Sequence, residues 1–102
     1  MTDKQLIKYL ANNNDRDYNL LKASEECQEL SLILTQLLSK GASIKDIIEE
    51  IGDVLFRIDV LKHLFDKDKI SERKAYKINK CKIYIKEGKY DNRVWQKKDL
   101  MK

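Results

Sequence analysis

Two short stretches of the chain carry carboxylates at matched spacing, within sequence that otherwise favours a buried helix. The first reads EECQE at residues 25–29, and the second reads EEIGD at residues 49–53. Residues three apart lie on the same face of a helix, so each stretch offers a pair of neighbouring carboxylates. Hard oxygen ligands of this kind suit Mg²⁺ or Mn²⁺. One such pair is common on a solvated helix face, whereas two pairs in matched positions indicate a metal site.

Helical periodicity places these acids beside two apolar stripes. The stripes consist of Ala23, Leu30, Leu34 and Leu37 in the first helix and of Ile47, Ile51, Val54, Ile58 and Leu61 in the second. Glu26 and Glu50 are predicted at the edge of their stripes, and Glu29 and Asp53 one step further out on the same flank. If the two helices pack antiparallel, the four carboxylates converge, and their mutual repulsion favours a bound divalent cation.

The net charge of +4 conceals an uneven distribution along the chain. Residues 1–61 carry 7 Lys/Arg and 11 Asp/Glu, whereas residues 62–102 carry 14 Lys/Arg and 6 Asp/Glu. The basic region could bind nucleic acid or a membrane surface, or it could bring cations to a polyanion whose metal is held by the acidic region. No apolar run approaches the roughly 18 residues of a membrane span, and the N-terminal residues lack the layout of a secretion signal. We therefore expect a cytoplasmic protein without a membrane-spanning segment.

The composition, with no Pro, three Gly and 37% charged residues, favours long helices and an all-α fold. Four helices are expected: one beginning at Thr2, and others over about residues 17–40, 44–65 and 70–87. The short connections between them favour antiparallel neighbours and a four-helix bundle. The sequence thus predicts a single domain over residues 1–102, with its core at about 17–88 and an irregular C-terminal tail at 89–102.

Local signals mark several of the predicted helix ends. Thr2 with Gln5, and Ser43 with Asp46, have the spacing of capping boxes, which begin helices. Gly41 is expected to end the second helix as its C′ residue, a position at which glycine is common.

The paired motif resembles the E-E-x-x-E … E-x-x-D signature of the all-alpha NTP pyrophosphatases, the MazG-like superfamily. The resemblance covers about residues 18–65, and EEIGDVLF at residues 49–56 looks especially like the second family motif. It implies a Mg²⁺-dependent hydrolase, with Mn²⁺ as an alternative, that cleaves a nucleoside triphosphate between the α and β phosphates to give a nucleoside monophosphate and pyrophosphate. It also implies a homodimer or homotetramer, and some members are house-cleaning enzymes for non-standard or excess dNTPs.

The resemblance assigns the metal ligands to the same residues that the helical periodicity selects, namely Glu26, Glu29, Glu50 and Asp53. Glu25, beside the first pair, is the predicted catalytic base that orients or deprotonates the attacking water, with Glu49 as the alternative.

Substrate-binding residues are predicted on the same helix and on a later one. Lys22 lies one turn before Glu26, where it could bind phosphate or simply form an i, i+4 ion pair. Family members commonly carry a basic element with an Asn on a later helix. Here Lys77, Asn79 and Lys80 are the corresponding predictions, with a solvated basic face as the other reading.

A non-catalytic helical oligomer is the alternative function, in which the basic C-terminal part binds nucleic acid or a protein partner. Binding of nucleic acid is not expected, because acidic residues are interspersed among the basic ones and no recognised nucleic-acid motif occurs. Oligomerisation is expected on physical grounds as well. Apolar residues outside the main stripes would need covering by another copy, namely Leu21, Leu32, Leu55 and Phe56.

Overall fold

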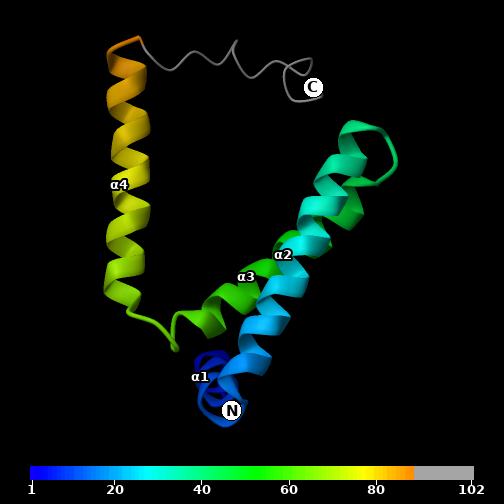
Figure 1. Ribbon diagram of the computed structural model, residues 1–102, viewed down its shortest axis with the longest axis vertical. Coiled ribbons are helices and arrows are strands. Elements are labelled where there is room, and N and C mark those ends of the chain that lie inside the picture. Colours follow the sequence, from blue (N-terminus) through cyan, green and yellow to red (C-terminus); the bar gives the residue numbers. More distant parts are fainter. Residues whose placement is uncertain (89–102) are drawn as a thin grey trace. The chain divides into compact units, whose positions relative to one another are not determined.

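The computed structural model describes residues 1–88, which form four α-helices and no strand (Figure 1). The helices are α1 (Asp3–Asn13), α2 (Arg16–Leu38), α3 (Ile44–Leu61) and α4 (Lys67–Lys86). The predicted all-α fold is therefore confirmed for the described part of the chain. The tail predicted at 89–102 lies outside the described residues. None of the described helices is both long enough and apolar enough to cross a membrane.

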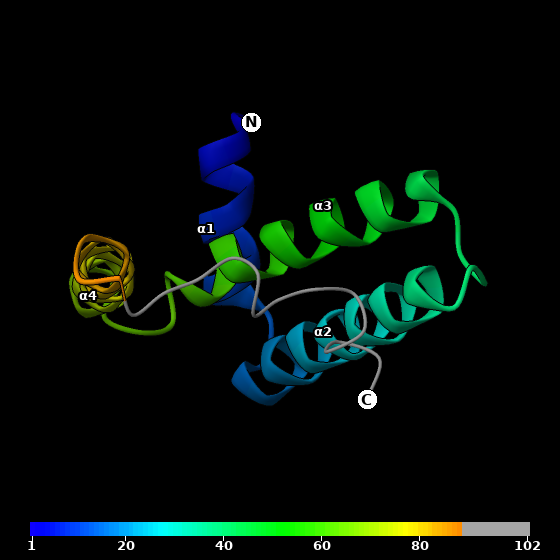
Figure 2. The same ribbon diagram turned by 90° about the horizontal axis from the view of Figure 1, so that it is seen from above.

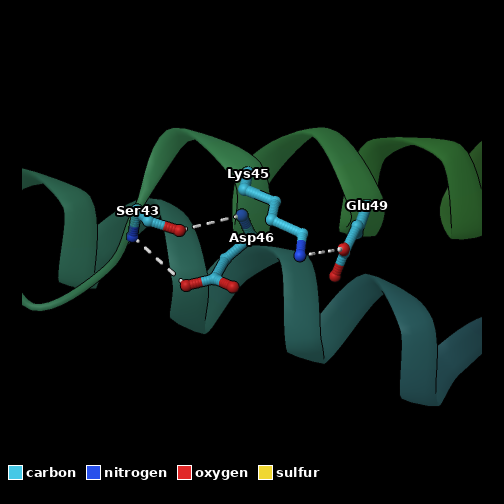
Figure 3. Close-up of polar contacts among 4 residues, drawn as sticks. All are labelled: Ser43, Lys45, Asp46 and Glu49. Atoms are coloured by element: carbon cyan, nitrogen blue, oxygen red, sulfur yellow. Dashed lines mark hydrogen bonds and ion pairs between the residues drawn. The ribbon is translucent and has the colours of Figure 1, made fainter.

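Both predicted capping boxes are present. At the start of α1, the Gln5 N–H donates to the Thr2 hydroxyl at 3.1 Å and the Thr2 N–H donates to Gln5 Oε1 at 2.8 Å. At the start of α3, the Asp46 N–H donates to Ser43 Oγ and the Ser43 N–H donates to Asp46 Oδ2, each at 3.2 Å (Figure 3). These reciprocal bonds satisfy backbone donors that the helix itself leaves without a partner.

The turn between α2 and α3 corrects the predicted role of Gly41. The left-handed residue is Lys40, with φ of 66°, and the helix ends at Leu38. The Gly41 N–H donates to the Gln36 carbonyl at 2.6 Å and the Lys40 N–H to the Leu37 carbonyl at 3.1 Å. This is the Schellman pattern, in which two successive N–H groups beyond the helix donate to carbonyls of its last turn. The first of the two donor residues takes the left-handed conformation. A lysine occupies that conformation here, although a glycine follows it directly.

The chain divides into two compact units, residues 1–66 and 67–102. In the first unit, α2 and α3 pack against each other as an antiparallel hairpin and α1 contacts α3 (Figures 1 and 2). The buried apolar residues of the described chain all belong to this unit and are Ala11, Ala23, Ile47, Val54 and Val60. Asn19 is also buried, and its Nδ2 donates to the Leu10 carbonyl at 3.3 Å, which ties the start of α2 to the end of α1.

The described part of the second unit is the continuous helix α4, which has no fully buried side chain. It is followed by Gly88 in a left-handed conformation, with φ of 72°. The helix begins three residues earlier and ends one residue earlier than the predicted range of 70–87. The single domain predicted over residues 1–102 stays a prediction.

Candidate metal site

The faces through which α2 and α3 pack are rotated relative to the predicted stripes. Along each helix one row of buried and half-buried residues has alternating spacings of three and four: Asn19, Ala23, Glu26, Leu30, Ile33 and Leu37 on α2, and Ile47, Glu50, Val54, Arg57 and Leu61 on α3. Val60, which is also buried, lies outside this row. Three residues of the predicted stripes, Leu34, Ile51 and Ile58, are instead exposed. Each packing face is turned by about 40° toward the acids, given 100° per residue. Glu26 and Glu50 therefore lie within the packing faces rather than at their edges.

Three of the four predicted ligands come together in the hairpin. One carboxylate oxygen from each of Glu26, Glu29 and Glu50 lies within 4.8 Å of the corresponding oxygens of the other two. Glu26 and Glu50 are half-buried and Glu29 is exposed. Asp53 is exposed and does not belong to this group, yet it is close enough for its charge to raise the pKa of both Glu26 and Glu50. The acid cluster is therefore defined here as Glu26, Glu29 and Glu50, with Asp53 at its margin.

Two carboxylate oxygens in the acid cluster lack a hydrogen-bond partner. They are Oε2 of Glu26 and Oε2 of Glu50, and both are buried. A buried carboxylate oxygen is costly unless a donor or a cation satisfies it. Two such atoms on facing helices, beside a third carboxylate, have the donor chemistry that Mg²⁺ and Mn²⁺ prefer. The residues present therefore fit a divalent cation.

The pKa shifts of two carboxylates in the acid cluster also favour a bound cation. Burial, followed by the charges of Glu29 and Asp53, raises the pKa of Glu26 above its ordinary value of 4.5. The pKa of Glu50 is raised by the same three causes and by the charge of Glu26. Both shifts mean that the ionised carboxylates are disfavoured where they stand. A bound cation would reverse this preference by stabilising the charged form.

Arg57 is a neighbour of the acid cluster that the sequence analysis did not identify. It is half-buried in the α3 packing face, one turn beyond Asp53, and its positive charge lowers the pKa of Glu26. Its guanidinium carbon lies 5.0 Å from the centre of the Phe56 ring. The spacing of seven residues from Glu50 could have revealed it, because residues seven apart share a helix face.

The predicted base and the predicted phosphate-binding lysine are paired with each other. Lys22 Nζ lies 3.2 Å from Glu25 Oε2, and its ammonium lies 5.6 Å from the centre of the Tyr18 ring. The ion pair of Lys22 is thus with the residue at i+3, not with Glu26 at i+4. Glu49, the alternative base, lies 4.0 Å from Lys45 (Figure 3).

The remaining predicted residues lie on α4 in the second unit. Asn79 and Lys80 help to line a shallow hollow of about 270 Å³ whose other lining residues are Tyr76, Ile83 and Tyr84. Lys80 Nζ lies 5.5 Å from the centre of the Tyr84 ring. Lys77 is exposed on the same helix and is not among the lining residues. A role of these three residues in binding phosphate stays a prediction.

The chemistry of the acid cluster is set by three convergent carboxylates, a fourth at the margin and a guanidinium nearby. Such a set can hold a divalent cation and place a positive side chain beside it. Comparison of the chain with protein-family models, with curated proteins and with solved structures finds no match to any of them.

Proposed function

We propose that this protein is a Mg²⁺-dependent nucleoside triphosphate pyrophosphohydrolase, which cleaves its substrate between the α and β phosphates. The observation that carries the proposal is the pair of buried carboxylate oxygens without a hydrogen-bond partner, on Glu26 and Glu50, beside the carboxylate of Glu29. The resemblance of the paired motif to the MazG-like superfamily supports the same reaction.

In this proposal Glu26, Glu29 and Glu50 hold the cation, and Asp53 supplies a fourth carboxylate. When bound, Mg²⁺ would neutralise charge on the phosphate oxygens and lower the pKa of a coordinated water. Because the carboxylates would fix the position of the cation, they would also determine how the triphosphate is oriented. Mn²⁺ has similar preferences for oxygen ligands and is the expected substitute.

Lys22 and Glu25 form a unit that substrate binding would rearrange. Lys22 is a donor for phosphate oxygens, but it is engaged with Glu25 at 3.2 Å. If Lys22 moves to a phosphate, the Glu25 carboxylate becomes free to accept a proton from the attacking water. The water oxygen then bonds to the scissile phosphorus, the bridging P–O bond breaks, and pyrophosphate leaves. Binding of the triphosphate would thus prepare the base.

Arg57 is suited to hold the phosphates in the same reaction. A guanidinium presents its N–H groups in a planar fork that matches two phosphate oxygens. Its position near Glu26 would place it beside a metal-bound triphosphate. We infer that it binds substrate, whereas its positive charge stabilises the carboxylate of Glu26 when no substrate is present.

The direct test is release of pyrophosphate from a panel of NTPs and dNTPs, measured with Mg²⁺, Mn²⁺ or EDTA. We expect metal-dependent release by the wild-type chain, loss of release in Glu50→Gln, and retention of release in Glu72→Gln, an exposed glutamate on α4. A folded protein that releases no pyrophosphate from any substrate and binds no Mg²⁺ would overturn the proposal.

A second candidate function rests on four side chains of α4, of which Lys80 is half-buried and the other three are exposed. The Arg73 guanidinium lies 4.6 Å from the centre of the Tyr76 ring, and Lys80 lies similarly over Tyr84. Cations interleaved with aromatic rings suit a polyanion that also offers stacking surfaces, such as single-stranded nucleic acid. Such binding would weaken steeply with salt and would not require Mg²⁺. The dependence on salt and the independence of Mg²⁺ separate this function from the hydrolase. If α4 instead binds a protein partner, neither pyrophosphate release nor binding of nucleic acid would be observed.

Assembly into a homodimer or homotetramer is part of the proposal. Of the four apolar residues that prompted this prediction, Leu21, Leu32 and Leu55 are exposed, whereas Phe56 is half-buried. Contiguous exposed apolar patches mark interfaces in soluble proteins, and we expect these three leucines to contribute to one. Sedimentation of the full chain over a range of concentrations tests the prediction.

A further inference from the structure

Helix α3 carries a second apolar stripe that no described residue covers. Its members recur at spacings of four, three, four and three and are Ile44, Ile48, Ile51, Leu55 and Ile58. They are between 36% and 64% exposed. On the helix surface this exposed stripe is centred about 100° away from the face that packs against α2. The same helix therefore has one apolar face in the core and another that faces solvent.

The spacing of the exposed stripe is that of a coiled-coil seam. In that description Ile44, Ile51 and Ile58 occupy one core position of the heptad, and Ile48 and Leu55 occupy the other. An apolar seam with this repeat is suited to pack against another helix along its whole length. The stripe of α3 therefore fits a long helix better than it fits a small ligand.

One edge of the exposed stripe is marked by Lys45, Gly52 and Asp59, which recur at intervals of seven residues. Lys45 and Asp59 are well exposed, with 84% and 58% of their side chains accessible. Their ion pairs within the chain are long, at 4.0 Å to Glu49 and 3.9 Å to Lys62. Exposed pairs of this kind contribute little stability, so both charges remain available to another partner.

The edge is complementary to itself when a second copy runs antiparallel. A two-fold axis beside Gly52 would bring Lys45 of one chain to Asp59 of the other, and the same contact would form twice. Symmetric dimers have this property, because residue i meets j and j meets i across the axis. In an antiparallel pair of helices, equivalent edge positions face one another, and Gly52 would face its own counterpart.

Gly52 supports a close approach at this point. A glycine within a helix costs about 1 kcal/mol relative to alanine, and a Cβ added at Gly52 would meet nothing within 4 Å. Packing within one chain therefore does not require a glycine here. A second helix crossing at the axis would, because the missing side chain lets two backbones come nearer than a larger residue permits.

We propose that α3 pairs antiparallel with α3 of a second copy, through the exposed stripe, with the two-fold axis beside Gly52. The exposed Leu34 on α2 lies on the same side of the hairpin and extends the apolar surface. The acid cluster lies on the opposite side and stays accessible. The interface does not depend on the proposed hydrolase activity, and the two can be tested separately.

The test is sedimentation equilibrium of the full chain, with charge reversal at the edge of the stripe. In Lys45→Glu two symmetry-related contacts become repulsive, and we expect the dimer to dissociate about tenfold more readily. Combining Lys45→Glu with Asp59→Lys should restore the wild-type dissociation constant. The same charge reversal on α1, Lys4→Glu, is the control and should leave the constant unchanged.

A substitution at the axis gives a second, independent readout. Gly52→Leu should lower dimer affinity by more than tenfold, yet leave the isolated helix content the same or higher, because leucine favours helix more than glycine does. Circular dichroism at a concentration where the chain is monomeric checks this. A wild-type chain that stays monomeric at high concentration, or a dimer that is insensitive to both Gly52→Leu and Lys45→Glu, would overturn the proposal.

Discussion

The α2–α3 hairpin has two flanks of opposite chemistry on either side of one core. One flank carries the acid cluster, and the other carries the exposed stripe of α3 together with Leu34 of α2. In an antiparallel pair the sense of rotation reverses between the two helices. Side chains displaced in the same direction on both helices therefore meet on the same side. The sequence of each helix repeats this arrangement, with acids on one side of the packing face and apolar residues on the other.

Both flanks are incomplete in a single chain, but for different reasons. In the acid cluster two buried carboxylate oxygens lack a hydrogen-bond partner, whereas the exposed stripe lacks apolar surface to pack against. Full burial of an isoleucine or leucine contributes about 1.5–3 kcal/mol, and an exposed ion pair about 0–1 kcal/mol. Covering the stripe would therefore supply the affinity between two copies, and the edge charges would select the register. In our proposals the first flank binds a divalent cation, and the second binds another copy of the chain.

The largest effect is expected when one flank is altered by substitution and the properties of both flanks are then measured. Glu50→Gln should reduce Mg²⁺-dependent pyrophosphate release by about 100-fold or more, since loss of groups that merely support a metal site already costs 10- to 100-fold. It should leave the dimer intact. In EDTA its melting temperature should rise, because a repelling carboxylate is removed. Pyrophosphate assays, sedimentation and thermal melts of one preparation provide the three readouts.

The reciprocal variant is Ile51→Ser on the exposed stripe. It should weaken the dimer while Mg²⁺ still raises the melting temperature of the monomer. If Ile51→Ser abolished the Mg²⁺ response, or Glu50→Gln dissociated the dimer, the two flanks would not be independent.

Stability without metal should depend on pH in a defined direction. The pKa values of Glu26 and Glu50 are raised in the folded chain, so the folded state binds protons more tightly than the unfolded state. The free energy of unfolding in EDTA should therefore fall as the pH rises from about 4.5 through the raised pKa values. Denaturant titrations across this range measure it. Saturating Mg²⁺ should flatten the dependence, and so should Glu50→Gln; an equally steep fall in that variant would contradict the assignment.

Arg57 should produce a smaller effect, confined to the acidic flank. Arg57→Ala removes a charge-assisted contact to phosphate, and we expect the KM for the triphosphate to rise by roughly 10-fold or more. The melting temperature without metal should fall, because Glu26 loses a favourable charge. Arg57→Lys should recover the melting temperature better than the KM, since an ammonium keeps the charge but not the planar fork. Equal recovery of both would limit Arg57 to balancing the charge of Glu26.

The smallest effect is expected in the turn between α2 and α3, which fixes how the two helices align. Lys40→Gly should raise the free energy of unfolding by about 1 kcal/mol, because glycine adopts the left-handed conformation without a Cβ penalty. Neither pyrophosphate release nor the dimer constant should change. Denaturant unfolding measures the gain, and Lys8→Gly, at an exposed position within α1, should have the opposite sign.

Much of the first unit could be predicted from the sequence because its signals are local. The capping residues Thr2 and Ser43 set the starts of α1 and α3, and three of the four carboxylates predicted to converge come together. The rotation of the packing faces could not be predicted. Apolar residues on α2 and α3 lie both in the core and on the uncovered flank. The predicted stripes therefore combined residues from these two surfaces. Arg57 was missed because a charged residue at a packing position looks like part of a solvated face.

The connection between α2 and α3 has a consequence for the order in which the two flanks form. Only residues 39–43 separate the helices, so their contacts arise between segments close in the chain, and helical folds of such low contact order assemble in microseconds to milliseconds. The carboxylates converge as soon as the hairpin closes, at any protein concentration. The exposed stripe must instead wait for a diffusional encounter, whose rate depends on how much of the protein is present. A newly made chain would thus acquire its acid cluster first and meet a second copy later.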